Sequence, residues 1–389
     1  MSFLDVLLLI VKCLIVALAA TTLFAYFTLF ERRTLAWFQN RVGPNRAGPG
    51  GIFQPLADAV KLFFKEDVTP MMADRWVYII SPAFAVIPAI IIWATIPLGF
   101  WPDGRGGNIL QVADINVGIL YLLAITSLGV YGIAIAGWAS NNKYSMLGGV
   151  RASAQVISYE LALGLAALGA VMQAGSFTTS EIVAQQSGLW FVIPQFLGFV
   201  VFVVASTAEV VRAPFDLVEA EQELVGGYNT EYGSMKFALF FMSEYIKLIA
   251  MNAIAVTLYL GGWHFPGLNE NLLTFLRSSL GEFGGNMLFG LLSLGSFLLK
   301  VAALSFVSVW VRASVPRIRY DQLMDLGWKS LMPLALFNVV LTAVVNVLLP
   351  AQPIGSIVAF VVGLITFLAV ATLAGPKKPK STLTLVKKT

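Results

Sequence analysis

The stretch Glu209–Tyr232 reads EVVRAPFDLVEAEQELVGGYNTEY and gathers negative charge in a chain that is otherwise apolar. It holds six of the 21 Asp and Glu residues of the chain and one basic residue, Arg212. Carboxyl groups packed this closely titrate as a coupled set, because each negative charge disfavours the ionisation of the next. Such a set holds protons nearer to neutral pH than isolated carboxyls do. We therefore interpret this acidic stretch as the functional centre around which the rest of the chain is arranged.

Long apolar runs lie on both sides of the acidic stretch and continue through most of the 389 residues. The mean hydropathy is +0.81, which soluble domains do not sustain. We expect an all-α polytopic membrane protein, with residues 1–374 as a single transmembrane domain and residues 375–389 as a flexible, basic cytoplasmic tail. The nine predicted spans are residues 3–30, 77–100, 116–139, 153–174, 189–211, 236–261, 286–311, 330–349 and 353–374.

Basic residues divide unevenly between the two sets of loops that these spans separate. One set, together with the C-terminal tail, carries 19 Lys and Arg residues, whereas the other carries only Arg105 and Arg277. Cytoplasmic loops hold the excess of positive charge in membrane proteins. The pattern therefore predicts an N-terminus outside the cytoplasm, and an acidic stretch and a C-terminus inside it.

Cysteine and histidine are almost missing from the chain, and this restricts its chemistry. Cys13 is the only cysteine and His264 the only histidine. One thiol makes neither a disulfide nor an iron–sulfur or zinc site, and one imidazole does not supply paired haem ligands. We expect that any redox reaction uses cofactors held by partner proteins, and that His264 is an interfacial loop residue.

The first cytoplasmic loop is expected to contain a helix at the membrane surface. Ile52–Glu66 places Phe53, Leu56, Val60, Phe63 and Phe64 on one face and Asp58, Lys61 and Lys65 on the other. Such a helix lies along the interface with its apolar face towards lipid or other spans. One interpretation is a simple surface anchor. The other is a binding site, because a carboxylate beside lipid is costly unless it faces a polar group.

Ionisable residues inside the predicted spans are costly and therefore informative. Glu160, Glu209 and Glu244 all lie near the cytoplasmic ends of their spans, and we expect them to form a shallow tier beside the acidic loop. Glu244 and Lys247 are three residues apart, so a local ion pair is the structural alternative. Lys300 is expected near the bilayer middle, where it needs a partner or a water-filled cavity.

The acidic loop also has a structural interpretation. Asp216 and Glu219 after Pro214 fit a capping box that opens a short helix, which Gly226-Gly227 would end. On that helix Asp216, Glu219 and Glu223 would share one side, and Glu221 would face away from it. Capping accounts for two carboxylates, but like charges four residues apart destabilise a helix. We interpret the remaining acids as functional, or as a contact for a basic partner surface.

The chain resembles the H subunits of the proton-pumping NADH–quinone oxidoreductases, respiratory complex I, from about residue 30 to residue 328. The resemblance depends on an ordered series of motifs: ERR (31–33), RVGPNR (41–46), QPLADAVK (54–61), FKE (64–66), GWASNNKYS (137–145), RAS (151–153), SYE (158–160), PFD (214–216), EAEQEL (219–224), GY (227–228), EY (231–232), GGW (261–263), RAS (312–314) and RYDQ (319–322). One departure stands out, because some relatives have Glu where this chain has Ser127. Ser127, water or a neighbouring subunit would then replace that carboxyl.

The resemblance implies a membrane subunit that forms the membrane side of a quinone chamber, anchors a hydrophilic redox arm and relays quinone reduction to proton translocation. It implies quinone-binding roles for Arg32, Arg41, Asp58, Ala59 and Arg312. It implies relay or chamber roles for Glu160, Glu209, Asp216, Glu219, Glu221, Glu223, Glu231 and Glu244. The quinone is the substrate, of unspecified type. NAD, FMN and iron–sulfur clusters would be held by partner subunits, next to antiporter-like membrane subunits in a bacterial cell membrane.

Two other classes of protein share some of these features. A stand-alone proton-coupled transporter also has acids inside the membrane and irregular loops, but its substrate site is expected at mid-membrane. Here only Lys300 is charged at that depth, and the acids lie near the cytoplasmic face. The membrane anchor of a related hydrogenase shares the whole layout. The electron donor that co-purifies with the chain distinguishes these alternatives.

Overall fold

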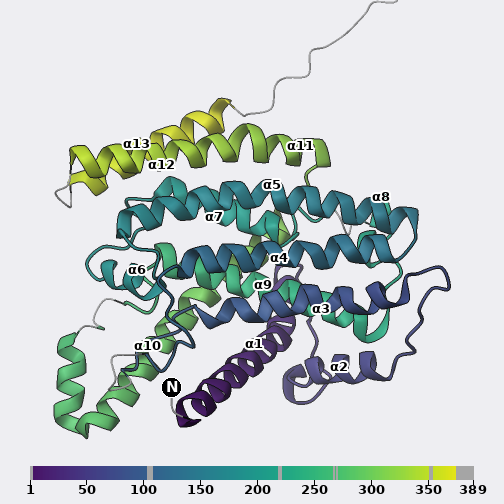
Figure 1. The fold of residues 1–389 in the computed structure, drawn as a ribbon, viewed down its shortest axis with the longest axis horizontal. Coiled ribbons are helices and arrows are strands. Elements are labelled where there is room, and N and C mark those ends of the chain that lie inside the picture. Colours follow the sequence, from purple (N-terminus) through teal and green to yellow (C-terminus); the bar gives the residue numbers. More distant parts are fainter. Residues whose placement is uncertain are drawn as a thin grey trace, which may run out of the picture.

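The fold, known from a computed structural model, is a bundle of long helices (Figure 1). The structure describes residues 3–102, 108–217, 221–265, 268, 270–349 and 354–373. The helices are α1 (Phe3–Phe38), α2 (Gln54–Phe64), α3 (Arg75–Ile91), α4 (Gly118–Ala139), α5 (Lys143–Ala174), α6 (Thr179–Gln185), α7 (Phe196–Glu209), α8 (Glu221–Leu224), α9 (Ser234–Tyr259), α10 (Glu270–Ser314), α11 (Tyr320–Asp325), α12 (Met332–Leu348) and α13 (Ile354–Leu373). A π-helical turn, Leu326–Leu331, joins α11 to α12.

The all-α membrane architecture is confirmed. Within the described residues, eight helices are long and apolar enough to cross a membrane, and α7 is a shorter apolar helix. Each of the nine predicted spans corresponds to one of these helices. Some helices extend beyond the predicted spans, since α5 begins at Lys143 rather than near residue 153 and α10 at Glu270 rather than near residue 286. The fifth span is shorter than predicted, because α7 begins at Phe196 rather than near residue 189. Residues 191–195 form turns instead, around Pro194, which has no N–H group to donate to a helix.

The core of the bundle is centred on α5, which packs against α4, α7 and α12. Its buried face is built from small residues, including Ala162, Ala166 and Ala170. Gly137 and Gly149 allow a close approach of α4 to α5, since a Cβ atom on Gly137 would lie 3.0 Å from the Gly149 Cα. Membrane helices associate through such small-residue surfaces. In Figure 1, α3, α4 and α5 lie nearly parallel, whereas α1 and α10 cross them at an angle.

The interfacial helix forms as predicted, two residues shorter at each end. Pro55 lies in the first turn of α2, where the missing N–H costs no hydrogen bond. None of its residues is buried within this chain. Leu56, Phe63 and Phe64 are each more than 60% exposed, so the apolar face is available to lipid or to a ligand. In Figure 1, α2 lies below α3, apart from the parallel layer.

The predicted capping box falls partly outside the described residues, because Glu219 lies in the gap between Leu217 and Glu221. Before that gap the Phe215 N–H donates to the Arg212 carbonyl in a turn, and after it the described part of the acidic helix is α8. The Asp216 carboxylate pairs with Arg317, across the bundle, and this contact competes with helix capping. Glu219 and the tail 375–389 lie outside the described residues, as does the side chain of Glu221.

Candidate functional site

A cavity of about 550 Å³ lies between α1, α2 and α9. Most of its wall is apolar, and Phe24, Phe63, Phe241 and Met242 contribute to it. The polar side chains in its lining come from α1 and α2. Its volume falls in the range of ligand pockets, which combine an apolar wall with a few polar groups. The amphipathic helix therefore forms one wall of a binding-sized space and is more than a surface anchor.

An ion pair marks the polar edge of this cavity. Arg32 Nη1 lies 2.8 Å from Asp58 Oδ2, and Lys61 Nζ lies 3.8 Å from the other carboxylate oxygen. The Gln54 side chain donates to that same oxygen at 3.3 Å. The Arg32 side chain is 46% exposed and that of Asp58 is 25% exposed, so this pair contributes little to folding. The exposed charges remain available to a polar ligand group.

The five residues predicted to bind quinone separate into two groups. Arg32, Asp58 and Ala59 all line the cavity. Arg41 lies in the following loop and donates to Gln39 at 2.7 Å. Arg312 contacts Glu31 instead of the cavity. The apolar lining was not predicted, because its aromatic residues are indistinguishable in sequence from ordinary lipid-facing ones.

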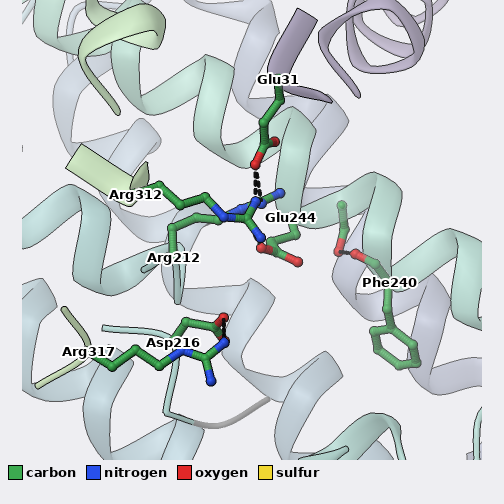
Figure 2. A network of polar contacts seen from close by, with 8 residues as sticks. Glu31, Arg212, Asp216, Phe240, Glu244, Arg312 and Arg317 are labelled. Atoms are coloured by element: carbon green, nitrogen blue, oxygen red, sulfur yellow. Dashed lines mark hydrogen bonds and ion pairs between the residues drawn. The ribbon is translucent and has the colours of Figure 1, made fainter. Parts of the chain in front are cut away.

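A cluster of four charged residues lies next to the cavity; Glu31, Arg212 and Glu244 are at most 13% exposed, whereas Arg312 is 35% exposed. Arg212 Nε lies 2.5 Å from Glu244 Oε1, and its Nη1 lies 3.4 Å from Glu31 Oε1. Arg312 contacts the same Glu31 oxygen. Figure 2 shows the Arg212 guanidinium between the two carboxylates, and its carbon also lies 3.8 Å from the centroid of the Tyr245 ring. Glu31 directly precedes Arg32 in α1, so cluster and cavity share a helix turn.

This four-residue cluster is balanced, with two carboxylates and two guanidinium groups. Burying charges costs free energy that ion pairing and hydrogen bonds offset only when the geometry is good. Removing one partner leaves an unpaired buried charge, which is much worse than removing both. If one member of the cluster gains or loses a proton, the electrostatic energy of the other members therefore changes strongly.

Glu209 and Lys247 form a second buried pair, 2.8 Å apart. The Glu209 side chain is fully buried, and its Oε2 atom has no hydrogen-bond partner in the described part of the chain. Glu209, Glu244 and Lys247 together line a small cavity of about 40 Å³, which has room for about one water molecule. The predicted alternative was an ion pair between Glu244 and Lys247. Instead, Glu244 pairs with Arg212 and Lys247 pairs with Glu209, so each has a partner on another segment.

Glu160 completes the tier of intramembrane acids. It accepts a hydrogen bond from Ser127, the residue at which some relatives have Glu. Ser127 lies on α4 and Glu160 on α5, so a second carboxyl at this position would face Glu160 directly. No ion pair of Glu160 is found among the described residues. A neutral serine here leaves Glu160 without the repulsion of a second carboxylate.

Three further acids of the acidic stretch, Asp216, Glu223 and Glu231, do not gather into one patch. Glu223 lies 2.9 Å from Arg151, Glu231 accepts from the Asn142 side chain at 2.6 Å, and Asp216 lies 3.2 Å from Arg317. Figure 2 shows the last pair below the Arg212 cluster and separate from it. Each acid thus has its own partner on a different element.

Lys300 lies against the C-terminal end of α9. Its ammonium donates to the carbonyl oxygens of Leu260, Gly262 and His264 at 2.5–2.9 Å and lies 4.3 Å from the centroid of the Trp190 ring. We expected a partner or a water-filled cavity, and the partner is this group of carbonyls at a helix end, where cations are favoured. Burial, and then the nearby ammonium, lower the pKa of His264. Lys300 therefore has a structural explanation that is separate from the acidic stretch.

Sequence reasoning missed two residues of the ion pairs described above: Glu31, the partner of Arg212, and Arg317, the partner of Asp216. Glu31 stands in the ERR motif, at the end of an apolar run, and that position is a signal that it faces the membrane edge. Nothing local marks Arg317, because its partner Asp216 is 101 residues away in the chain.

Comparisons with known proteins identify the family. A model of the NADH dehydrogenase family matches residues 11–343. The chain is 47% identical over 340 residues to an NADH-quinone oxidoreductase H subunit of Geobacter metallireducens, covering 87% of this chain and 96% of that protein. It is 49% identical over 336 residues to the NADH-quinone oxidoreductase H subunit of Rhodospirillum rubrum, covering 86% and 92%. The chain therefore belongs to the NADH dehydrogenase family, among the H subunits of the NADH-quinone oxidoreductases.

Proposed function

We propose that this chain is the membrane subunit of a proton-translocating NADH:quinone oxidoreductase. It forms the membrane side of the quinone-binding chamber, anchors the hydrophilic redox arm and relays quinone reduction to proton translocation. The observation that carries this proposal is the adjacency of two features on α1. Arg32 lines an apolar cavity, and its neighbour Glu31 belongs to a buried charge cluster.

The cavity suits a molecule with a polar head and an apolar tail. Its aromatic and aliphatic wall would surround an isoprenoid tail and keep it out of contact with water, and this burial favours binding. Arg32 offers N–H groups to a quinone carbonyl oxygen, and Asp58 orients that guanidinium. Because α2 lies at the interface, a lipid-soluble substrate reaches the cavity from the membrane without crossing water.

The buried acids suit a relay of charge. Reduction of a quinone consumes electrons, which come from NADH through flavin and iron–sulfur cofactors of partner subunits, and it consumes protons. A change of charge at the chamber alters the electrostatic balance of the Glu31–Arg212–Glu244 cluster. The change affects all three residues because they are in direct contact with one another. The small cavity beside Glu244 and Glu209 has room for a water that passes a proton between them. Glu160 continues this series in α5.

The test begins with the assembled complex. A tagged chain is purified from its native membrane, and the co-purifying subunits and the NADH:quinone reductase rate are measured. We expect partner subunits carrying the flavin and iron–sulfur cofactors, and an NADH-dependent reduction of quinone. Purification of the chain alone, or with a hydrogenase, would contradict the proposal.

The proposed orientation has its own test. Single cysteines replace Gly106 and Ser381, which lie outside the described residues, in a Cys13→Ser background. With the N-terminus outside and the tail in the cytoplasm, as the 19-to-2 distribution of basic residues predicts, they label from opposite sides of sealed vesicles. Labelling from the same side would overturn the topology.

A further inference from the structure

The start of α9 holds the C-terminal end of α2. Ser234 Oγ lies 3.0 Å from the Leu62 carbonyl oxygen and 2.8 Å from that of Lys65. Leu62 lies in the last turn of α2, where helix carbonyls have no partner within the helix, and Lys65 is the residue that follows the helix. The serine hydroxyl thus caps the helix from another segment of the chain.

A second contact holds the residues that follow α2. Lys236 Nζ lies 2.9 Å from Asp67 Oδ2 and 3.1 Å from Thr69 Oγ1. The Lys236 side chain is 13% exposed and that of Asp67 is 51% exposed, so the lysine is held inside the chain while solvent reaches its partner. Ser234 and Lys236, two residues apart, therefore contact both the end of α2 and the segment after it.

These contacts matter because α2 has few others. None of its residues is buried within the chain, so hydrophobic packing does not fix its position. The Arg32–Asp58 pair ties it to α1, and that pair is largely exposed. An element with little buried apolar surface opens locally at low cost. The position of α2, and with it one wall of the cavity, depends on its polar contacts.

The same lysine also lies against Tyr78, which contacts the acidic segment, the residues Gly226–Gly233 that carry Glu231. Its Nζ lies 4.8 Å from the centroid of the Tyr78 ring. Tyr78 donates to the Glu231 carbonyl at 2.6 Å and stacks on Tyr232, with ring centroids 4.1 Å apart. Burial raises the pKa of Tyr232 to about 12, so its phenol remains neutral at neutral pH. A movement of Lys236 is therefore transmitted to the residues that carry Glu231.

The backbone at Ser234 adds an independent observation. Ser234 has a φ of +53°, in the left-handed region that residues other than glycine rarely adopt. The residue is 3% exposed and begins α9. Strained conformations of this kind persist where the surrounding contacts require them. Here the strained residue aims its hydroxyl at the end of α2.

We propose that Ser234 and Lys236 are positioning residues that clamp the C-terminal end of α2, set the width of the cavity between α1, α2 and α9, and tie that wall to the acidic segment. The effect of the clamp on quinone rests on the proposed function of the chain. The clamp itself is a statement about the position of α2 and is tested without quinone.

The first experiment measures amide hydrogen exchange of residues 54–65 in the assembled complex without quinone. Lys236→Met removes the charge at nearly constant volume, and Lys236→Arg keeps it. We expect exchange in this segment to be roughly tenfold faster in Lys236→Met, as for the loss of one hydrogen bond to a charged group. Lys236→Arg restores most of the protection. Lys329→Met, which removes an exposed pair with Asp325 elsewhere, leaves this segment unchanged.

Two further variants keep the test independent of assembly defects. Asp67→Asn weakens the same pair from its exposed side and is expected to accelerate exchange by a smaller factor. Ser234→Gly keeps the positive φ and removes the hydroxyl, whereas Ser234→Ala removes the hydroxyl and keeps the strain. Unchanged exchange of residues 54–65 in Asp67→Asn and Ser234→Gly would overturn the clamp.

The second experiment measures steady-state kinetics with a long-tailed quinone in the same variants. A displaced cavity wall weakens binding without altering the redox centres, so we expect the quinone KM to rise and kcat to change little. Faster exchange with an unchanged KM would leave the clamp standing and contradict the assignment of the cavity to quinone. A fall in kcat at constant KM would overturn the positioning role.

Discussion

The apolar cavity and the buried charge cluster lie on consecutive residues of α1, yet they are built on opposite principles. The cavity has an apolar wall, a volume of about 550 Å³ and charged groups only at its edge, where they remain partly exposed. The cluster has four charges in contact, three of them at most 13% exposed, with a cavity of only about 40 Å³ beside Glu244. The first can exchange a ligand. The second can exchange only charge.

The difference shows how a single chain can place substrate binding and charge transfer in separate groups of residues. A ligand site needs space and a few polar contacts whose loss costs little folding energy. A relay needs titratable groups whose charges strongly affect one another. Mutations in the two regions should therefore fail in different ways.

Arg212→Met should have the largest effect. It removes the cation between Glu31 and Glu244 and leaves two buried carboxylates with too little compensation. Breaking a buried ion pair from one side costs about 3–5 kcal/mol, so we expect little assembled complex and a lower unfolding temperature for what remains. Blue-native electrophoresis and thermal unfolding measure both, with Lys329→Met as the control. Normal assembly of Arg212→Met would show that the cluster is less desolvated than its geometry indicates.

Asp58→Asn should affect binding more than folding. The carboxylate loses its charge at the edge of the cavity, where it orients Arg32. We expect the complex to assemble normally and the apparent quinone KM to rise roughly tenfold, as for the loss of one charge-assisted hydrogen bond. Steady-state kinetics on purified complex provide the measurement. A loss of assembly with unchanged KM would favour a structural role for Asp58 and would remove the contrast between the two regions.

Glu223→Gln should have the smallest effect on stability. Its pair with Arg151 is partly exposed on both sides, and exposed pairs contribute about 0–1 kcal/mol. We expect an unfolding temperature within about a degree or two of the parent complex. Any loss of proton pumping in this variant then reflects the missing titratable group. A stability loss as large as that of Arg212→Met would erase the distinction between the exposed and the buried acids.

The fold was predictable because it depends on local features of the sequence, such as the lengths of apolar runs and the spacing of apolar residues. Apolar length alone located the spans, and the spacing of Phe53, Leu56 and Val60 located the amphipathic helix. Asp58 could also be singled out, since a carboxylate beside lipid needs a reason. The predicted start of the fifth span near residue 189 was wrong because hydropathy does not register the turn around Pro194.

The charge partners were less predictable. Arg212 pairs with Glu31 across 181 residues, and Asp216 with Arg317 across 101. Such contacts depend on how helices pack, which no local spacing encodes. The local alternative, a Glu244–Lys247 pair, followed from spacing and was replaced by pairs of Glu244 with Arg212 and of Lys247 with Glu209. Arg32, Asp58 and Ala59 of the cavity could thus be named from sequence, whereas the partners of the buried charges could not.

We infer that the buried acids couple quinone reduction to proton translocation and that the cavity binds the substrate. The Glu244→Gln variant provides the sharpest test of this division. The substitution keeps the shape of the side chain and removes its charge beside Arg212. Membrane-potential formation and NADH:quinone reductase rate are measured on the same reconstituted complex. We expect potential formation to fall, with turnover falling alongside it in a tightly coupled complex, while NADH oxidation by an artificial acceptor at the hydrophilic arm survives. Full potential formation at the parent quinone reductase rate would contradict the account and leave the cluster as a structural element.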